Sequence, residues 1–276
     1  MLVSGASSGI GAACTARLAA AGYDVVAGMR EPCDRPAESS GASVHVVPLD
    51  VTCAASVTRA VEFATTLAGD RGLAALVNCA GISVMGPIET LPIDRWRRQY
   101  EVNVFGTVAL TQACLPALRR ARGRVVIVSS IAGRVSTAYS GAYSSSKYAL
   151  EAIADALRLE VARWHVGVSL IEPGAIATPI WLKVDASWAE AATGAAPDVS
   201  ALYRSAIAGM RAEVARYGAR AIGVEPVVRA IEHALTSRRP RIRYLVGREA
   251  RLRATVRAWL PDRLHDALMR RVMHLP

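Results

Sequence analysis

The chain opens with Met-Leu-Val-Ser-Gly-Ala-Ser-Ser-Gly-Ile-Gly, residues 1–11, in which a short apolar run leads into three closely spaced glycines. Glycine permits tight turns and lets backbone N–H groups approach a ligand closely. A strand, a glycine turn and a helix in this order place those N–H groups at a helix N-terminus, where phosphate groups bind. The stretch therefore predicts the first unit of a dinucleotide-binding sheet, although three glycines alone are a weak signal.

Apolar segments of strand length recur along the rest of the chain, separated by Ala-rich segments of helical length. They lack apolar/polar alternation, which is typical of parallel strands that are covered on both faces. The pattern predicts an α/β fold, a doubly wound parallel sheet (Rossmann fold) of about seven strands with helices on both faces. The predicted strands are residues 1–4, 25–28, 44–49, 73–77, 124–129, 166–171 and 242–246, the last at one edge.

Composition narrows the class of protein. The chain has 276 residues, 52% of them apolar, which predicts one domain over residues 1–276 with a substantial core. No apolar run is long enough for a membrane span and the start lacks the features of a signal peptide, so we expect a soluble, cytoplasmic protein. The five cysteines form no Cys-x-x-Cys pair and the five histidines are scattered, so neither a disulfide framework nor a metal site is predicted.

The net charge of +10 is concentrated near the C-terminus, where residues 238–276 hold eleven arginines and three acidic residues. Residues 248–276 are predicted to form basic helices. Such a segment can contact nucleic acid, anionic lipid or an acidic protein, but arginine also favours helices and keeps a surface hydrated. We expect solvated helices and no nucleic-acid partner, with contact to a membrane surface as the alternative. The preceding residues 174–220, with Trp181 and Trp188, predict a substrate lid, in which the tryptophans either line a pocket or hold the lid.

The residues that follow each predicted strand are informative, because ligands bind beyond the carboxyl ends of parallel strands. Arg30 follows the second strand, where an acidic residue would hold the ribose hydroxyls of NAD. A cation there favours the 2′-phosphate of NADP, although a surface arginine is the plain alternative. The other strands are followed by Asp50-Val51-Thr52, Asn78-Cys79-Ala80-Gly81, Ser129-Ser130 and Pro173-Gly174. Together these strand ends predict one site at one edge of the sheet.

In these segments the sequence resembles the short-chain dehydrogenase/reductase family over about residues 1–180. The glycine turn matches the family's Thr-Gly-x-x-x-Gly-x-Gly with Ser4 in place of Thr, and residues 78–81 match Asn-Asn-Ala-Gly with Cys79, which we expect to be a packed thiol, in place of the second Asn. The family's catalytic Asn, Ser, Tyr and Lys match Asn103, Ser130, Tyr143 and Lys147. The resemblance implies NADP(H) contacts from Gly5, Ser7, Ser8, Gly9, Ile10, Arg30, Asp50, Val51, Asn78, Ala80, Gly81, Tyr143, Lys147, Pro173, Gly174 and Thr178.

Tyr143 and Lys147 are four residues apart on a helix predicted to begin near Ala142, so both side chains can meet one ligand. A free phenol has a pKa near 10, and forming phenolate near neutrality needs about 3 to 4 kcal/mol from a nearby ammonium and an oxidised nicotinamide. The neutral phenol can already protonate an alkoxide. We hypothesise that Tyr143 is the general acid/base, that Lys147 lowers its pKa and holds the nicotinamide ribose, and that Ser130 hydrogen-bonds the substrate oxygen. By resemblance, Asn103 positions a water that links Lys147 to solvent.

Residues 171–181 and the long C-terminal region look most like the hydroxysteroid and retinol dehydrogenase-like members of the family. The resemblance implies an NADP(H)-dependent oxidoreductase that transfers hydride between nicotinamide and the carbonyl or secondary alcohol of a hydrophobic, steroid-, retinoid- or ketone-like substrate. One alternative is a reductase of 3-oxoacyl thioesters bound to a carrier protein. Another is a sensor that binds NADP without catalysis.

The resemblance also implies a homodimer or homotetramer, because in the family the helices that carry Asn103 and Tyr143 pack against their symmetry mates. The small and apolar residues of the second helix would permit close approach, although core packing explains them equally well; they are Ala149, Ile153, Ala156 and Leu157. Family members usually carry several more residues before the glycine turn. We therefore expect either a start further upstream or a first strand that is short of hydrogen bonds.

Overall fold

A computed structural model describes residues 1–31, 43–182, 184, 188 and 197–273 of the chain, so Cys33 and part of the predicted lid lie outside the described residues. Seven parallel strands form one sheet in the order β3-β2-β1-β4-β5-β6-β7, which confirms the doubly wound Rossmann fold with β7 at an edge. The strands are β1 (Leu2–Ser4), β2 (Val25–Met29), β3 (Val44–Pro48), β4 (Ala75–Asn78), β5 (Arg124–Val128), β6 (Gly167–Pro173) and β7 (Arg243–Val246).

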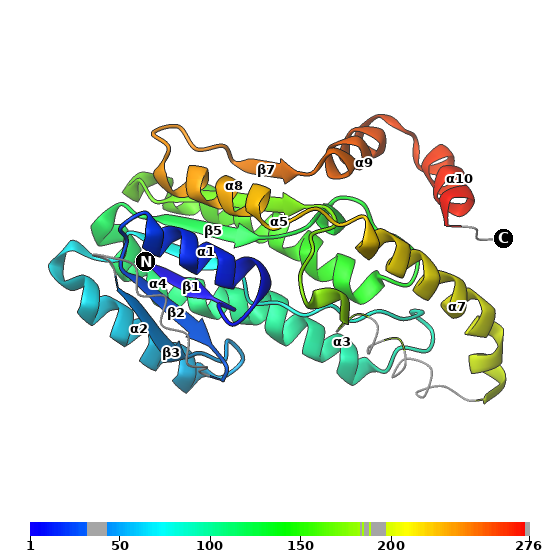
Figure 1. The fold of residues 1–276 in the computed structure, drawn as a ribbon, viewed down its shortest axis with the longest axis horizontal. Coiled ribbons are helices and arrows are strands. Elements are labelled where there is room, and N and C mark those ends of the chain that lie inside the picture. Colours follow the sequence, from blue (N-terminus) through cyan, green and yellow to red (C-terminus); the bar gives the residue numbers. More distant parts are fainter. Residues whose placement is uncertain (32–42, 183, 185–187, 189–196, 274–276) are drawn as a thin grey trace.

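Helices cover both faces of this sheet (Figure 1). One core cluster fills the space beneath α2, α4 and α5, and a second lies beneath α1 and α8. The helices are α1 (Gly9–Ala20), α2 (Ala54–Ala68), α3 (Ile93–Tyr100), α4 (Gly106–Ala121), α5 (Gly141–Val161), α7 (Pro197–Ala219), α8 (Glu225–Thr236), α9 (Arg248–Trp259) and α10 (Asp262–Val272). Short helical turns lie at Gly69–Arg71, Glu101–Phe105, Ile131–Gly133 and Ala162–Trp164.

The predicted strand boundaries shift by a few residues. β4 begins at Ala75, later than predicted, because the N–H of Leu73 instead donates to the carbonyl of Ala117 at the end of α4. β1 has three buried residues and is paired on both sides, with Leu2 opposite Val26 and Leu76. The central strand is thus short but fully inserted in the sheet.

The chain changes direction across the sheet at β1, since β2 and β3 lie on one side of it and β4, β5 and β6 on the other. A ligand site is expected beyond the carboxyl ends of the strands at such a switch point. The last helices return to this end, where α7, α9 and α10 gather (Figure 1). No helix among the described residues combines the length and the apolar character needed to cross a bilayer.

Candidate active site

The glycine turn after β1 is held against the exit of β4 by one hydroxyl. Ser4 Oγ accepts hydrogen bonds from the N–H groups of Cys79 and Ala80, at 3.1 and 3.2 Å. Gly5 has φ +65°, and a Cβ there would lie 2.8 Å from Ala80 Cα. A Cβ on Gly11 would lie 2.2 Å from the Gly5 carbonyl oxygen. Two of the predicted strand ends therefore touch, and only glycine fits where they do.

The helix that follows this turn fits an anionic ligand. α1 begins at Gly9, its N-cap Ser8 makes no side-chain hydrogen bond to the helix, and its first turn carries no acidic residue. The first N–H groups of the helix therefore point outward at the positive end of the helix dipole. A Cβ on Gly9 would lie 3.2 Å from Thr178, so the segment after β6 closes over the same turn. This cradle suits the pyrophosphate of a nicotinamide dinucleotide.

Arg30 and Asp50 lie at the ends of the next two strands. Thr52 donates to Asp50 Oδ1 from its hydroxyl at 2.7 Å and from its N–H at 2.9 Å. These bonds lower the pKa of Asp50, and the nearby charge of Arg30 lowers it further. Arg30 itself is exposed. Val51 is buried and fills the space above Gly106, where a Cβ would lie 2.6 Å from it.

Two predicted site residues, Asn78 and Asn103, form side-chain hydrogen bonds that hold elements of the fold together. Asn78 donates from Nδ2 to Thr111 Oγ1 at 3.1 Å, which ties β4 to α4. Asn103 lies in a π-helical turn and bonds both backbone groups of Ile82, accepting at 2.8 Å and donating at 3.0 Å, and it also donates to Ser146 Oγ at 3.2 Å. The side chain of Asn103 thus holds the segment after β4 against α5, and its role toward water stays a prediction.

Lys147 projects from the first turns of α5 into the site. Its Nζ donates to the carbonyl of Val128 at the end of β5, at 2.9 Å, and lies 5.8 Å from the centre of the Tyr143 ring. Burial lowers the pKa of Lys147 to about 8, while the charges of Cys79 and Glu151 act in the opposite direction. An ammonium has three N–H donors, so two remain for a ligand.

Tyr143 is half-buried and lies beside Ser130. Burial raises the pKa of Tyr143 above its ordinary value, and a hydrogen bond with the Ser130 side chain opposes this shift. The hypothesised lowering by Lys147 is therefore absent from this structure, because desolvation of the phenolate dominates. Ser130 Oγ also accepts from the N–H of Ala132 at 3.1 Å, which fixes the turn that presents it. Cys79 is half-buried against the core, and desolvation raises its pKa well above that of a free thiol, as expected for a packed thiol.

These groups lie at one end of a cavity of about 500 Å³. Eight predicted site residues line it: Ile10, Gly81, Ser130, Tyr143, Lys147, Pro173, Gly174 and Thr178. Its other walls are largely apolar, among them Met85, Val135, Ile180, Val184, Met210 and Val214. Trp181 lines the cavity with its ring set edge-on to Tyr217, whereas Trp188 is buried against Tyr139 and Met210. One tryptophan thus faces the cavity and the other anchors the segment after β6.

The C-terminal helices form one wall of the cavity, which the sequence analysis missed. Leu252 and Val256 of α9 and Leu268 of α10 line it, and Ala250 packs against Ile131 in the Ser130 turn. Most residues of these helices are exposed, as expected for solvated helices, but the expectation missed the apolar side chains between the arginines that line the cavity. His265, one of the five scattered histidines, also lines the cavity. The detectable signal was the repeat of Leu, Met and Val along residues 252–273.

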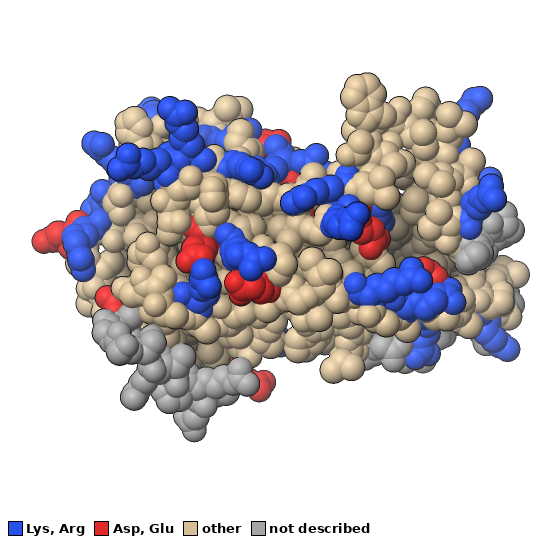
Figure 2. Space-filling view, turned by 45° about the horizontal axis from the view of Figure 1, so that its top comes forward, with Lys and Arg blue, Asp and Glu red and all other residues tan. Residues whose placement is uncertain are grey.

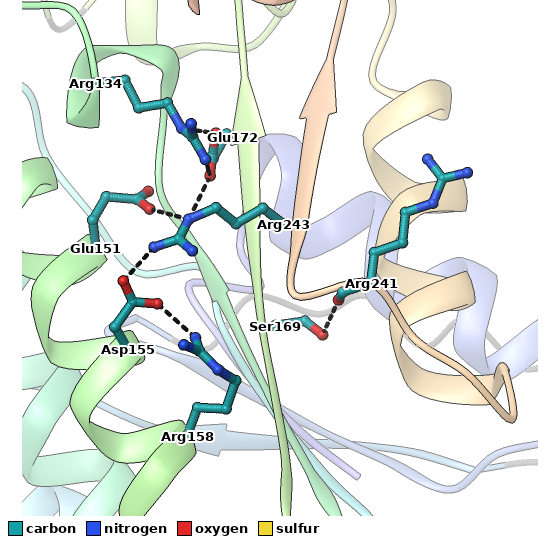
Figure 3. A network of polar contacts seen from close by, with 8 residues as sticks. All are labelled: Arg134, Glu151, Asp155, Arg158, Ser169, Glu172, Arg241 and Arg243. Atoms are coloured by element: carbon teal, nitrogen blue, oxygen red, sulfur yellow. Dashed lines mark hydrogen bonds and ion pairs between the residues drawn. The ribbon is translucent and has the colours of Figure 1, made fainter. Parts of the chain in front are cut away.

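An ion network around a buried carboxylate supports the part of the cavity that Ser130 and Lys147 line (Figure 3). Glu172, the penultimate residue of β6, is fully buried between Arg134 at 2.6 Å and Arg243 at 3.3 Å. Arg243 also binds Glu151 at 3.0 Å and Asp155 at 2.7 Å, both on α5. Burial raises the pKa of Glu172, and its two arginines oppose that shift. The network links the turn of Ser130, the helix of Lys147 and the strand that precedes Pro173.

Sequence reasoning missed this network, since its partners are far apart in the chain. One signal was present: Glu172 is a lone acid directly after a predicted apolar strand. Such an acid in a sheet that is covered on both faces needs buried cations.

Comparison with known proteins places this geometry in a family. The family model for short chain dehydrogenases matches residues 1–188. Retinol dehydrogenase 5 of Mus musculus is 33% identical over 288 residues, covering 100% of this chain and 89% of that protein. The NADPH-dependent 3-dehydrocapnine reductase of Ornithobacterium rhinotracheale is 36% identical over 274 residues, covering 97% of this chain and 94% of that protein.

A solved structure agrees over the same length. A short chain dehydrogenase from Burkholderia cenocepacia J2315, solved in complex with NADP, is 26% identical and superposes with a TM-score of 0.73, covering 97% of this chain and 95% of that chain. The resemblance seen in the sequence, including that to retinol and hydroxysteroid dehydrogenases, is confirmed. With a glycine turn, a Ser, Tyr and Lys that line one cavity, and relatives that match over its whole length, the chain belongs to the short-chain dehydrogenase/reductase family, whose members are oxidoreductases acting on CH–OH and C=O groups.

Proposed function

We propose that this enzyme uses NADP(H) to interconvert a carbonyl and a secondary alcohol on a hydrophobic substrate that is steroid-, retinoid- or ketone-like. The observation that carries the proposal is the position of Ser130, Tyr143 and Lys147 at one end of a largely apolar cavity of about 500 Å³. Apolar walls with a few convergent polar groups are typical of sites for bulky hydrophobic ligands. We also propose that residues 174–220 form the substrate lid of a single domain over residues 1–276.

The chemistry divides between cofactor and protein. The nicotinamide, when bound, gives or takes the hydride. Tyr143 supplies the proton to the carbonyl oxygen in reduction, and its raised pKa keeps the phenol neutral and ready to donate at neutral pH. Ser130 hydrogen-bonds the same oxygen, where negative charge develops. Lys147 holds the nicotinamide ribose with the N–H groups that Val128 leaves free. The neutral phenol favours reduction over oxidation at pH 7.

The choice of NADP rests on Arg30. It is exposed at the end of β2, and its charge reaches Asp50 at the end of β3. A guanidinium at this edge can bind a 2′-phosphate with two parallel hydrogen bonds. The relative from Ornithobacterium rhinotracheale is named as NADPH-dependent, and the Burkholderia cenocepacia structure holds NADP, which supports the same choice here.

Cofactor titration tests this choice. Quenching of tryptophan fluorescence by NADPH and NADH gives both affinities for the wild type and for Arg30→Ala. We expect NADPH to bind the wild type at least ~tenfold more tightly than NADH, and the variant to lose that margin, a difference of about 1.4 kcal/mol. Equal affinity for NADH in the wild type would contradict the assignment of Arg30.

Substitution of Tyr143 by Phe tests the catalytic role. Reduction of a panel of hydrophobic ketones and aldehydes should fall by at least ~100-fold in Tyr143→Phe, because a positioned general acid is worth about that factor or more. Tyr23→Phe, at the opposite ends of the strands, is the control and should keep wild-type rates. If the wild type binds NADPH but reduces nothing on the panel, the sensor alternative is favoured. Reduction of carrier-bound 3-oxoacyl thioesters alone would favour the carrier-bound alternative.

A further inference from the structure

The outer surface of α9 and α10 carries large apolar side chains in contact with solvent. Leu252 is 64% exposed, Trp259 84% and Leu264 58%, and Leu268 and Val272 are also exposed. In a helix that only rests on a core, such side chains turn inward and charged ones cover the outside. Five exposed large apolar residues within two short helices form a patch of the kind that marks an interaction site. We call this the α9–α10 surface.

Positive charge surrounds this surface. Exposed arginines lie along both helices, at Arg248, Arg251, Arg263, Arg270 and Arg271. Two of the three acidic residues are already paired, Glu249 with Arg253 and Asp262 with Arg257. Figure 2 shows that the end of the molecule formed by α9 and α10 is largely tan, with blue side chains around it and few red ones. Apolar protrusions ringed by cations match the chemistry of an anionic lipid interface.

The cavity opens on the same surface. Leu252, Leu268 and Val272 line the cavity and are exposed to solvent at the same time. Side chains that belong both to the wall and to the outside mark an opening between α9 and α10. A ligand that leaves the cavity here passes directly between the apolar side chains of the α9–α10 surface.

We propose that the α9–α10 surface docks onto an anionic lipid bilayer. Trp259 and Leu264 insert among the headgroups, while the exposed arginines bind lipid phosphates. The two helices lie in the plane of the interface, and the opening of the cavity faces the lipid. A hydrophobic substrate can then pass between bilayer and cavity without crossing water, a consequence that rests on the proposed function.

Other occupants fit the surface less well. A nucleic acid would bind the arginines but would leave Trp259 and two leucines in water. A second copy of this chain, packed about a twofold axis, would bring the two sets of arginines together without acids to neutralise them. A bilayer buries the apolar side chains and neutralises the cations together, and tryptophan is enriched at such interfaces.

Vesicle co-sedimentation of the full chain tests the docking. The wild type should bind vesicles that contain about 30% phosphatidylglycerol and bind pure phosphatidylcholine at least ~tenfold more weakly, with binding reduced by added salt. Trp259→Asp with Leu264→Asp should lower the partition coefficient on the anionic vesicles at least ~tenfold. Arg263→Glu with Arg270→Glu should do the same.

Matched controls lie on and beside α2, at the opposite end of the molecule (Figure 1). Phe63→Asp with Leu67→Asp changes two residues that are 43% and 40% exposed, and Arg59→Glu with Arg71→Glu reverses two exposed cations. Both should keep wild-type partitioning. The proposal is overturned if the wild type ignores anionic vesicles, or if the α2 controls lose binding equally. It is also overturned if Trp259→Asp with Leu264→Asp dissociates an oligomer in light scattering without vesicles.

Kinetics separate docking from the proposed function. With a ketone dissolved in anionic vesicles, kcat/KM of the wild type should exceed that of the Trp259→Asp, Leu264→Asp variant several-fold, whereas a water-soluble ketone should be reduced equally by both. Vesicle binding without turnover of either ketone would defeat the proposed function and leave the docking standing. Turnover of both ketones without vesicle binding would defeat the docking alone.

Discussion

We expect Lys147 to set an upper pH limit on carbonyl reduction. Its pKa is lowered to about 8 by burial, so the ammonium is present below that pH and is lost as the pH rises through it. Tyr143 has a raised pKa and remains a neutral donor over this range. We expect kcat/KM for a ketone, which reports groups of the free enzyme, to fall as the pH rises through about 8. A pH profile of initial rates measures it, and a flat profile between pH 7 and about 9 would contradict it.

Glu151 offers a finer test at the same site. Its carboxylate lies one turn after Lys147 on α5 and raises the pKa of Lys147. Glu151→Gln should therefore move the falling limb of the profile to lower pH, because the ammonium loses a stabilising charge. Asp155→Asn is the matched control, since Asp155 also binds Arg243 but lies a further turn away from Lys147. If the falling limb of the pH profile shifts equally in both variants, the shift comes from disturbance of the Arg243 network and not from loss of the Glu151 charge.

Some residues of the site could be identified from the sequence, whereas others became apparent only in the structure. Ser130, Tyr143 and Lys147 were located by their match to the family's catalytic residues, and the structure brings them together. The pKa of Tyr143 could not be predicted, since its direction depends on how deeply the phenol is buried. His265 was equally out of reach, because only the return of α10 to the site places it in the cavity wall.

At the scale of elements, the close approach of the glycine turn to α1 decides whether the cofactor cradle forms. Gly11→Ala would place a Cβ 2.2 Å from the Gly5 carbonyl oxygen, so backbone must move. We expect a loss of about 1–3 kcal/mol of stability by urea unfolding and at least ~tenfold weaker NADPH binding by fluorescence. Gly209→Ala on α7 has open space around the new Cβ and should leave both quantities at their wild-type values or slightly improve stability.

The Glu172 network joins four elements: β6, β7, α5 and the turn after β5 (Figure 3). Glu172→Gln removes the buried charge between Arg134 and Arg243 and should cost about 3 kcal/mol in urea unfolding, near the lower end for broken buried pairs because both arginines are partly exposed. Glu213→Gln breaks an exposed pair with Arg216 and should change stability by less than about 0.5 kcal/mol. Equal losses of stability in Glu172→Gln and Glu213→Gln would contradict a stabilising role for the buried Glu172 pair.

For the whole molecule, the strands and the doubly wound sheet followed from periodicity, whereas the walls of the cavity did not. Apolar runs identify strands because a sheet covered on both faces tolerates little else. Seven arginines from Arg248 to Arg271 lie among the apolar residues of α9 and α10. The composition of this segment therefore indicated helices that are exposed to solvent. The Arg243 to Glu172 pair joins two neighbouring strands that lie far apart in the chain, and no local pattern predicts its geometry.

Association is the remaining prediction at this scale. Ala149 and Ile153 on α5 are half-buried, Ala156 is exposed, and Leu157 packs on the core, so one face of α5 is free to meet a second copy. We expect a dimer or tetramer by light scattering at micromolar concentration. Ala156→Glu should shift it toward monomer, because a charge would be buried where helices approach closely. A wild-type monomer would exclude the arrangement.

The cavity is built from two stretches of chain with different duties. The residues proposed to handle hydride and proton lie before residue 180, whereas α7, α9 and α10 supply other walls of the cavity. Substitutions in these helices can alter which molecule is held and leave Ser130, Tyr143 and Lys147 untouched. Enzymes of this fold can therefore share one reaction and differ in substrate, and the family model, which matches residues 1–188, ends before α7 begins at Pro197.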